Sequence, residues 1–276
     1  MKRVKAIVVA GFGINCEQEM QAAYQKAGAQ TDIIHLNDIF DERVSLSDYH
    51  ILNFPGGFSF GDDLGSGKVM ANKMKYKQTK NGDEFFKKLK KFVNRGKYIL
   101  GICNGFQFLV KMGLLPNTMR DLHQEVTLTF NKSGKFEDRW CYLKVNKKTN
   151  TPFLKNISMI YLPIRHGEGR LIFANKKIRE NIKKNNLNCM SYCNKNGKVT
   201  SKYPFNPNGS ELNCAALTDK TGRIFGMMPH PEAFLSVYNH PAWTYLKRKN
   251  RNKEKGDGLR IFENIVKHVK KNYKGI

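Results

Sequence analysis

Cys103 is the residue of this sequence best placed for chemistry, because it lies between two glycines in the segment Gly101–Gln107. The apolar run 97–100 before it predicts a strand, and the amphipathic run 106–112 after it predicts a helix. A cysteine at such a strand-to-helix turn has its sulfur lifted above the sheet edge, where the N–H groups of the first helical turn favour a thiolate. The alternative is a buried structural cysteine, because free cysteine often packs as a small hydrophobe.

A base for this thiol is predicted in the segment Met228–Glu232, in which prolines flank His230 on both sides. The prolines stiffen the segment and favour an extended backbone at His230. Side chains two residues apart face the same way in an extended chain, so His230 and Glu232 could act in series. The imidazole would take the thiol proton, and the carboxylate would hold the ring and its charge. An ordinary loop histidine is the alternative, and the two prolines and Glu232 favour the catalytic interpretation.

The segment Phe54–Asp62 contains a Pro-Gly-Gly turn directly after an apolar run. Paired glycines at a strand end let the backbone approach a substrate and direct N–H groups at it. The N–H of Gly57, together with the N–H of Asn104 after the cysteine, predicts an oxyanion hole. A simple turn is the alternative, because Pro-Gly-Gly is common in turns.

A third polar cluster lies between two predicted strands, in Pro163–Arg170. Its histidine, His166, could be an acid–base group, a substrate clamp or a turn residue. Because His230 has the better-placed carboxylate, we interpret this segment as a loop that shapes the substrate site.

The first half of the chain alternates between strand and helix patterns, which predicts βαβ units and a parallel sheet. The carboxyl ends of parallel strands meet at one edge, so the segments that contain Gly57, Cys103 and His230 are expected to lie together there. The strands are expected at 5–10, 31–36, 50–54 and 97–102, and the helices at 17–27 and 83–94.

The second half has more alternating runs, which are typical of antiparallel or edge strands. The polar stretch 185–209 is interpreted as a surface excursion, and a single α/β domain is the economical interpretation. The strands are expected at 125–130, 140–145, 158–164, 170–173, 214–217 and 224–228, and a closing helix at 258–271.

The formal charge of +25 suggests a nucleic-acid partner, but the lysines are spread along the whole chain. The dense run 87–91 fits the solvent face of a helix, and neither it nor the run 247–251 accompanies a nucleic-acid motif. We therefore favour a solvated surface over a nucleic-acid site.

The six cysteines follow no disulfide or zinc pattern, since Cys189 and Cys193 lack a second close pair. We expect no metal site and a reducing cytoplasm. No apolar run approaches the length of a membrane span, and the run 6–10 is too short for a signal-peptide core.

Taken together, four segments resemble the class I (triad) glutamine amidotransferases, and most closely their glutaminase subunits for phosphoribosylformylglycinamidine synthase. The resemblance spans most of the chain in the right order, and 11–17 also looks like the first loop of that branch. The four segments are Pro55–Asp62, Gly101–Gln107, His166–Gly169 and Met228–Glu232.

This resemblance implies an α/β fold: a flavodoxin-like three-layer sandwich with a mostly parallel central sheet and an added antiparallel portion. It implies one amidotransferase domain over 1–276, with basic insertions near 73–82, 185–209 and 234–256. The implied catalytic residues are Cys103, His230 and Glu232, the oxyanion donors Gly57 and Asn104, and the substrate-binding residues Phe58, Gln107, His166, Gly167 and Glu168.

The resemblance also implies that the chain hydrolyses L-glutamine and passes ammonia to a larger synthase subunit, which converts formylglycinamide ribonucleotide to formylglycinamidine ribonucleotide. ATP and Mg²⁺ are expected in that subunit, since this chain has no Gly-x4-Gly-Lys-Ser/Thr motif and no cofactor is expected in it. A small accessory subunit would complete the complex. The alternatives are a glutaminase for another synthase, a non-enzymatic basic module that binds nucleic acid, and a cysteine hydrolase or peptidase on the same scaffold.

Overall fold

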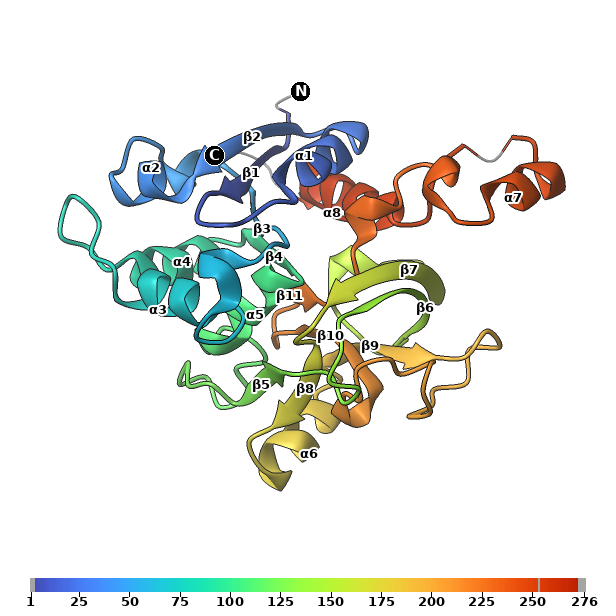
Figure 1. The fold of residues 1–276 in the computed structure, drawn as a ribbon. Helices are drawn as coiled ribbons and strands as arrows, with labels where there is room; N and C mark the ends of the chain where they lie inside the picture. Colours follow the sequence, from blue (N-terminus) through green and yellow to red (C-terminus); the bar gives the residue numbers. More distant parts are fainter. Residues whose placement is uncertain (1–2, 253, 273–276) are drawn as a thin grey trace.

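The computed structural model describes residues 3–252 and 254–272 (Figure 1). The other residues of the expected domain 1–276, including one position of the basic segment 234–256, lie outside the described residues.

A nine-stranded sheet forms the centre of the described structure, in the order β2-β1-β3-β4-β11-β10-β9-β6-β7. The five strands from β2 to β11 run parallel, and each pair from β11 to β7 is antiparallel. The parallel strands are β1 (Lys5–Ala10), β2 (Gln30–His35), β3 (Ile51–Phe54), β4 (Tyr98–Ile102) and β11 (Ile224–Met227). The others are β10 (Cys214–Thr218), β9 (Asn188–Cys193), β6 (Glu137–Val145) and β7 (Met159–His166), and a separate pair contains β5 (Val126–Thr129) and β8 (Arg170–Phe173).

Helices cover the parallel strands on both sides, which gives the expected three layers (Figure 1). On one side α1 packs on α8, with an edge contact between the rings of Tyr24 and Phe262. On the other side α5 packs on β3 and β4 beside α3, which contacts α4. The helices are α1 (Glu17–Lys26), α2 (Leu36–Phe40), α3 (Lys68–Tyr76), α4 (Phe85–Asn94), α5 (Asn104–Lys111), α6 (Lys176–Lys184), α7 (Trp243–Lys249) and α8 (Leu259–Asn272).

The strands and helices expected from the sequence are present in this fold. Helices α2, α3, α6 and α7 were not expected, and one further segment differs in an important way. The stretch 185–209, expected as a surface excursion, contributes β9 to the interior of the sheet between β10 and β6. Its apolar side chains, such as Met190 and Tyr192, are buried. Asn188 and Ser191 interrupt the apolar run, so the alternation in sequence is weak although the strand is central. The antiparallel part of the sheet is therefore larger than the sequence suggested.

The basic segment before α8 forms an arm that projects from the body (Figure 1). Its base is closed by a bridge between Ser236 and Lys255. No residue of α7, within this arm, is buried, and Trp243 and Tyr245 are both largely exposed. Within the described part of the chain, no helix is long and apolar enough to cross a membrane.

Candidate active site

Cys103 lies at the turn between β4 and α5, as its flanking glycines predict. Its backbone has φ 51° and ψ −106°, a conformation that L-residues rarely adopt and that costs about 1–3 kcal/mol. The N–H of Cys103 donates to the Met227 carbonyl at 2.8 Å, which fixes the turn to the end of β11. The thiol is buried and lies 3.6 Å from the Arg165 carbonyl oxygen. The strained turn thus contacts both the adjacent strand β11 and the more distant strand β7.

The glycines on either side of the cysteine are required by close packing. A Cβ at Gly105 would lie 1.9 Å from the Phe54 carbonyl oxygen, and one at Gly101 would lie 2.6 Å from the Gly105 carbonyl oxygen. Only glycine allows α5 to approach β3 and β4 this closely. The spacing Gly-x-Cys-x-Gly therefore sets the position of the sulfur at the sheet edge.

His230 and Glu232 form a buried pair directly after β11. Nδ1 of His230 lies 2.5 Å from Oε1 of Glu232, and both side chains are almost fully enclosed. The extended backbone expected at this position is not formed, because His230 has φ −104° and ψ 88° and Pro231 begins a short 3₁₀ turn, Pro231–Ala233. This turn brings the carboxylate back to the ring, so the pair forms by a different backbone path from the one predicted. The His230 N–H donates to the Pro163 carbonyl at 2.8 Å.

Gly56 shows how closely the side chains from the different loops approach one another. A Cβ at this glycine would lie 2.8 Å from Cε1 of His230 and 3.5 Å from Cβ of Cys103. The same Cβ would lie 3.3 Å from Sγ of Cys16. The loops after β1, β3, β4 and β11 therefore meet at one point, as the parallel arrangement predicts.

The environment of His230 favours its protonated form. Burial alone would lower the pKa of His230, but the charge of Glu232 and the contacts with Cys103 and Cys16 outweigh burial and hold this pKa well above its usual range. Nε2 of His230 has no hydrogen-bond partner within the described chain. The ring can therefore carry a proton and present it on the nitrogen that Glu232 does not occupy.

The expected oxyanion donors lie on the two segments next to the sulfur. Gly57 has φ 150°, and a Cβ there would lie 2.6 Å from the Gly13 carbonyl oxygen. Hydrogen bonds fix the peptides on both sides of it, since the Asn15 N–H donates to Gly56 and the Phe58 N–H donates to Gly13. Asn104 is the first residue of α5, so its N–H belongs to the open first turn of that helix.

The side chains of Asn104 and Gln107 connect α5 with two loops. Nδ2 of Asn104 donates to Oε1 of Gln107 at 2.7 Å, and its Oδ1 accepts from the Ser59 N–H at 3.2 Å. Nε2 of Gln107 donates to the Glu168 carbonyl at 2.7 Å, and Oε1 of Glu168 accepts from the Ser66 N–H. Gln107 thus has both polar ends in internal contacts, and it supports the 166–169 loop.

His166 is held by Asn131, a residue that the sequence did not single out. Oδ1 of Asn131 lies 3.1 Å from Nδ1 of His166 and also accepts from the Gly169 N–H, so Nδ1 must be the donor. The Asn131 N–H donates to the Gly167 carbonyl at 2.9 Å. Burial, with a contribution from His230, lowers the pKa of His166 to about 3, so the ring is neutral.

Phe58 is the most exposed of the expected site residues. It is 48% exposed, and its ring lies 6.3 Å from that of Phe136 in a stacked arrangement. The two rings come from different loops and form an apolar surface beside Gly57.

Comparisons with known proteins identify the family of the chain. Residues 3–269 match the family described as CobB/CobQ-like glutamine amidotransferase domain. The chain belongs to this family. It is 42% identical over 268 residues to the "Phosphoribosylformylglycinamidine synthase subunit PurQ" of Dehalococcoides mccartyi, with 97% of this chain and 98% of that protein covered. The PurQ subunit of Methanococcus maripaludis is also 42% identical, over 277 residues, with the same coverage.

Longer proteins and solved structures extend the likeness. The chain is 33% identical over 243 residues to phosphoribosylformylglycinamidine synthase of Drosophila melanogaster, with 86% of this chain and 18% of that protein covered. A chain of the PurLQS structure from Thermotoga maritima superposes with a TM-score of 0.70 at 28% identity, with 97% of this chain and 100% of that chain covered. The expected amidotransferase fold, with a parallel core and an antiparallel part, is confirmed.

Cys16 is a further residue at this sheet edge that the sequence did not single out for the site. It follows β1 and immediately precedes α1, at the same sheet edge as Cys103. The expectation that parallel strands end at one edge could have found it, because it lies just beyond the first strand. Burial raises the pKa of the thiol in each of the four remaining cysteines. They are Cys141, Cys189, Cys193 and Cys214.

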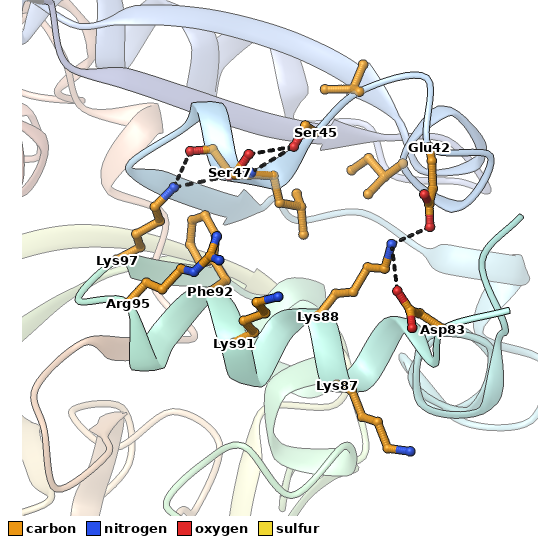
Figure 2. A pocket seen from close by; sticks show the side chains of 13 residues that line it. Glu42, Ser45, Ser47, Asp83, Lys87, Lys88, Lys91, Phe92, Arg95 and Lys97 are labelled. Carbon is orange, nitrogen blue, oxygen red and sulfur yellow. Dashed lines mark hydrogen bonds and ion pairs between the residues drawn. The ribbon is translucent and has the colours of Figure 1, made fainter. Parts of the chain in front are cut away.

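A separate cavity of about 420 Å³ lies at the opposite, amino ends of β3 and β4 (Figure 2). It lies between α4 and the segment 42–47. Several of the lysine side chains that line it already have hydrogen-bond or ion-pair partners. Lys88 pairs with Glu42 and Asp83, and the buried Lys97 donates to the Leu46 and Ser47 carbonyls. The apolar side chains of α4, such as Phe85 and Leu89, are buried.

Proposed function

We propose that this chain is the glutaminase subunit of phosphoribosylformylglycinamidine synthase, with Cys103, His230 and Glu232 as its catalytic triad. The observation that carries the proposal is the strained Cys103 turn with the buried His230–Glu232 pair beside it. The relatives named PurQ, which match this chain over nearly its full length, also support the proposal.

In the first half of the reaction, the Cys103 thiolate attacks the side-chain carbonyl carbon of L-glutamine. The carbonyl π electrons move to oxygen, and the Gly57 and Asn104 N–H groups bind the resulting oxyanion. The His230 imidazolium then donates a proton to the amide nitrogen, the C–N bond breaks, and ammonia leaves. A γ-glutamyl thioester on Cys103 and a neutral His230 ring remain.

In the second half, the neutral His230 ring takes a proton from water, and the oxygen attacks the thioester. The C–S bond breaks, glutamate leaves, and the thiolate and imidazolium are regenerated. Glu232 holds the ring through Nδ1 during both halves and stabilises its positive charge. The pKa of His230, raised by Glu232, is in keeping with this role.

The substrate-binding residues are proposed to surround the sulfur from two loops and one helix. Phe58 offers an apolar surface, and Gly167 and Glu168 offer polar backbone groups beside the buried ring of His166. Gln107 acts by holding the Glu168 backbone through its 2.7 Å hydrogen bond.

The ammonia is proposed to pass directly to a larger subunit that converts formylglycinamide ribonucleotide to formylglycinamidine ribonucleotide. In water most of it would become ammonium, which is not a nucleophile. ATP and Mg²⁺ would be bound by that subunit, and a small accessory subunit would complete the complex, which we place in the cytoplasm. The chain over 1–276 would act as a single domain. Its basic segments 73–82 and 234–256, and the part of 185–209 that follows the buried strand β9, would be available to partners.

A reconstituted complex tests this proposal by comparing two nitrogen sources. We expect Cys103→Ser to lower glutamine-dependent product formation by about 10³-fold or more while ammonia-dependent formation is retained. Cys193→Ser, a buried cysteine at the end of β9, is the matched control and should retain both activities. Glutamine-dependent turnover by Cys103→Ser would refute the assignment of the nucleophile.

A further inference from the structure

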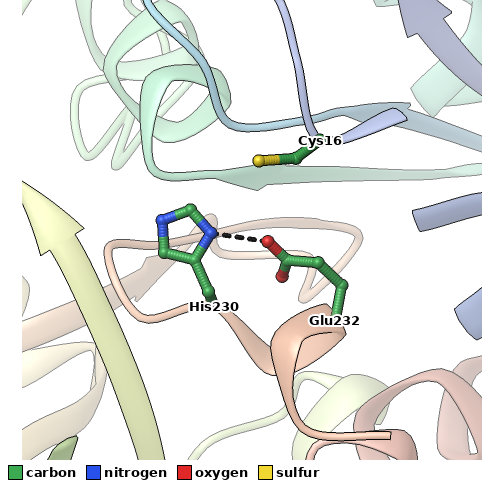
Figure 3. A group of neighbouring side chains, drawn as sticks. All are labelled: Cys16, His230 and Glu232. Atoms are coloured by element: carbon green, nitrogen blue, oxygen red, sulfur yellow. Dashed lines mark hydrogen bonds and ion pairs between the residues drawn. The ribbon is translucent and has the colours of Figure 1, made fainter. Parts of the chain in front are cut away.

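Three buried side chains at the active-site edge form a group with metal-ligating atoms. Sγ of Cys16, a ring nitrogen of His230 and a carboxylate oxygen of Glu232 all lie within 4.8 Å of one another. Figure 3 shows the sulfur above the edge of the ring that faces Glu232. Thiolate, imidazole and carboxylate are the three ligand types that proteins use for Zn²⁺. The ligands come from loops distant in sequence, so spacing alone gave no sign of this site.

The surrounding residues keep the space between these side chains free of other groups. Gly56 is essential to this, because a Cβ there would lie 3.3 Å from the Cys16 sulfur and 2.8 Å from the His230 ring. The Cys16 thiol donates a long hydrogen bond of 3.4 Å to Oδ1 of Asn15 and also contacts the His230 ring. Oε2 of Glu232 is buried and has no hydrogen-bond partner among the residues described. The Cys16 sulfur and Oε2 of Glu232 therefore each have a lone pair available for a metal ion.

We propose that Cys16, His230 and Glu232 form an inhibitory site for a thiophilic divalent cation such as Zn²⁺. The inference rests on the proposed function for its consequence, since His230 is the base and acid of that reaction. Tetrahedral zinc bonds of about 2.0–2.3 Å place ligand atoms roughly 3.3–3.8 Å apart. The Cys16 sulfur lies within 4.8 Å of the other ligand atoms, whereas Nδ1 of His230 and Oε1 of Glu232 are 2.5 Å apart and must separate. Side-chain rotations of this size would complete the site. A water molecule would take the fourth position, as in other three-ligand zinc sites.

Binding of the cation displaces two protons, and only bonds to hydrogen are broken. The cation takes the place of the Cys16 thiol proton and of the proton on Nδ1 between His230 and Glu232. A ring with the cation on Nδ1 and hydrogen on Nε2 can neither accept a proton from Cys103 nor protonate the leaving amine. Glutamine hydrolysis stops, and the Cys103 sulfur remains chemically unchanged. Removal of the cation by a chelator restores activity.

Direct binding is tested with Co²⁺ on the full chain carrying Cys103→Ser, in which the nucleophilic sulfur is absent. We expect a thiolate-to-cobalt absorption band at one equivalent of metal, with release of protons. The band should disappear in Cys103→Ser/Cys16→Ser and remain in the matched control Cys103→Ser/Cys193→Ser. A band that persists without Cys16, or no band in the Cys103→Ser protein, would overturn the proposal.

A second variant keeps the test decisive if removal of Cys16 impairs folding. Glu232→Ala in the Cys103→Ser protein should weaken Co²⁺ binding by about 10-fold or more, because it removes one ligand. An unchanged affinity would exclude Glu232 from the site. These binding measurements need no catalytic activity, so failure of the metal site and failure of the glutaminase assignment give different results.

In the active protein, Zn²⁺ should inhibit glutamine hydrolysis, and Cys16→Ser should require about 10-fold more Zn²⁺ for half inhibition. Each variant is compared with its own zinc-free activity. Equal sensitivity of the two proteins would place the inhibitory zinc on Cys103 instead and refute the role of Cys16.

Discussion

His166 makes the stability of this protein depend on pH in a way that can be calculated. Its pKa is about 3 in the folded protein, because the ring is buried and neutral. In the unfolded chain the ring has a pKa of about 6.5. Protonation therefore favours the unfolded state, and stability is lost as the pH falls below about 6.5 toward the folded pKa.

The size of this effect follows from the two pKa values. Between pH 8 and pH 5, protonation of the unfolded chain at His166 alone lowers the free energy of unfolding by about 2 kcal/mol. His166→Asn removes the titrating group and retains an amide N–H close to the position of Nδ1, which can still donate to Asn131. The loss of packing from the smaller side chain is the same at both pH values.

Urea denaturation of both proteins at pH 8 and pH 5 measures the difference. We expect the wild type to lose about 2 kcal/mol more than His166→Asn between the two pH values. The difference at pH 8 reports packing, and only its change with pH reports ionisation. If the stabilities of the two proteins fall in parallel, His166 is not a buried neutral ring.

Three further substitutions test the site, and a fourth serves as a control. Glu232→Gln should lower kcat for glutamine hydrolysis by about 10³–10⁴-fold; it should also move the alkaline limb of the pH profile to lower pH, because the raised pKa of His230 depends on this carboxylate. An unshifted limb would contradict that dependence. Gly105→Ala should lower the free energy of unfolding, measured by urea denaturation, by about 3 kcal/mol or more, because its Cβ would clash with the Phe54 carbonyl. The control Gly82→Ala has open space around it but φ 82°, and should lower this free energy by about 1–2 kcal/mol. Equal losses in the two variants would exclude the clash at Gly105. Asn131→Ala should raise KM for glutamine by about 10-fold, and an unchanged KM would show that the 166–169 loop does not bind substrate.

Much of the site could be predicted because its geometry depends on short segments. Close contacts between α5 and β3 require glycine near Cys103, so the spacing of these glycines in the sequence predicts where the sulfur lies. The alternation of strands and helices predicts that the loops after β3, β4 and β11 meet at one edge. The pairing of His230 with Glu232 was also predictable from their separation, although the 3₁₀ turn that forms it was not.

Other features depend on contacts between distant segments and left little trace in the sequence. β9 is buried by β10 and β6, which override the weak alternation caused by Asn188 and Ser191. Cys16 reaches His230 only because Gly56 leaves room between them. Asn131 contacts His166 although the two residues are 35 positions apart in the sequence, so no local pattern indicates this contact either.

The central claim is that Cys103 is the nucleophile that reacts with glutamine. Labelling of the full chain with a glutamine-analogue electrophile, followed by peptide mapping, tests this claim most directly. We predict modification of Cys103 alone among the six cysteines, slowed by L-glutamine and accompanied by loss of glutamine-dependent activity. Modification at Cys16 or at a core cysteine in place of Cys103, or labelling that glutamine does not slow, would contradict the account.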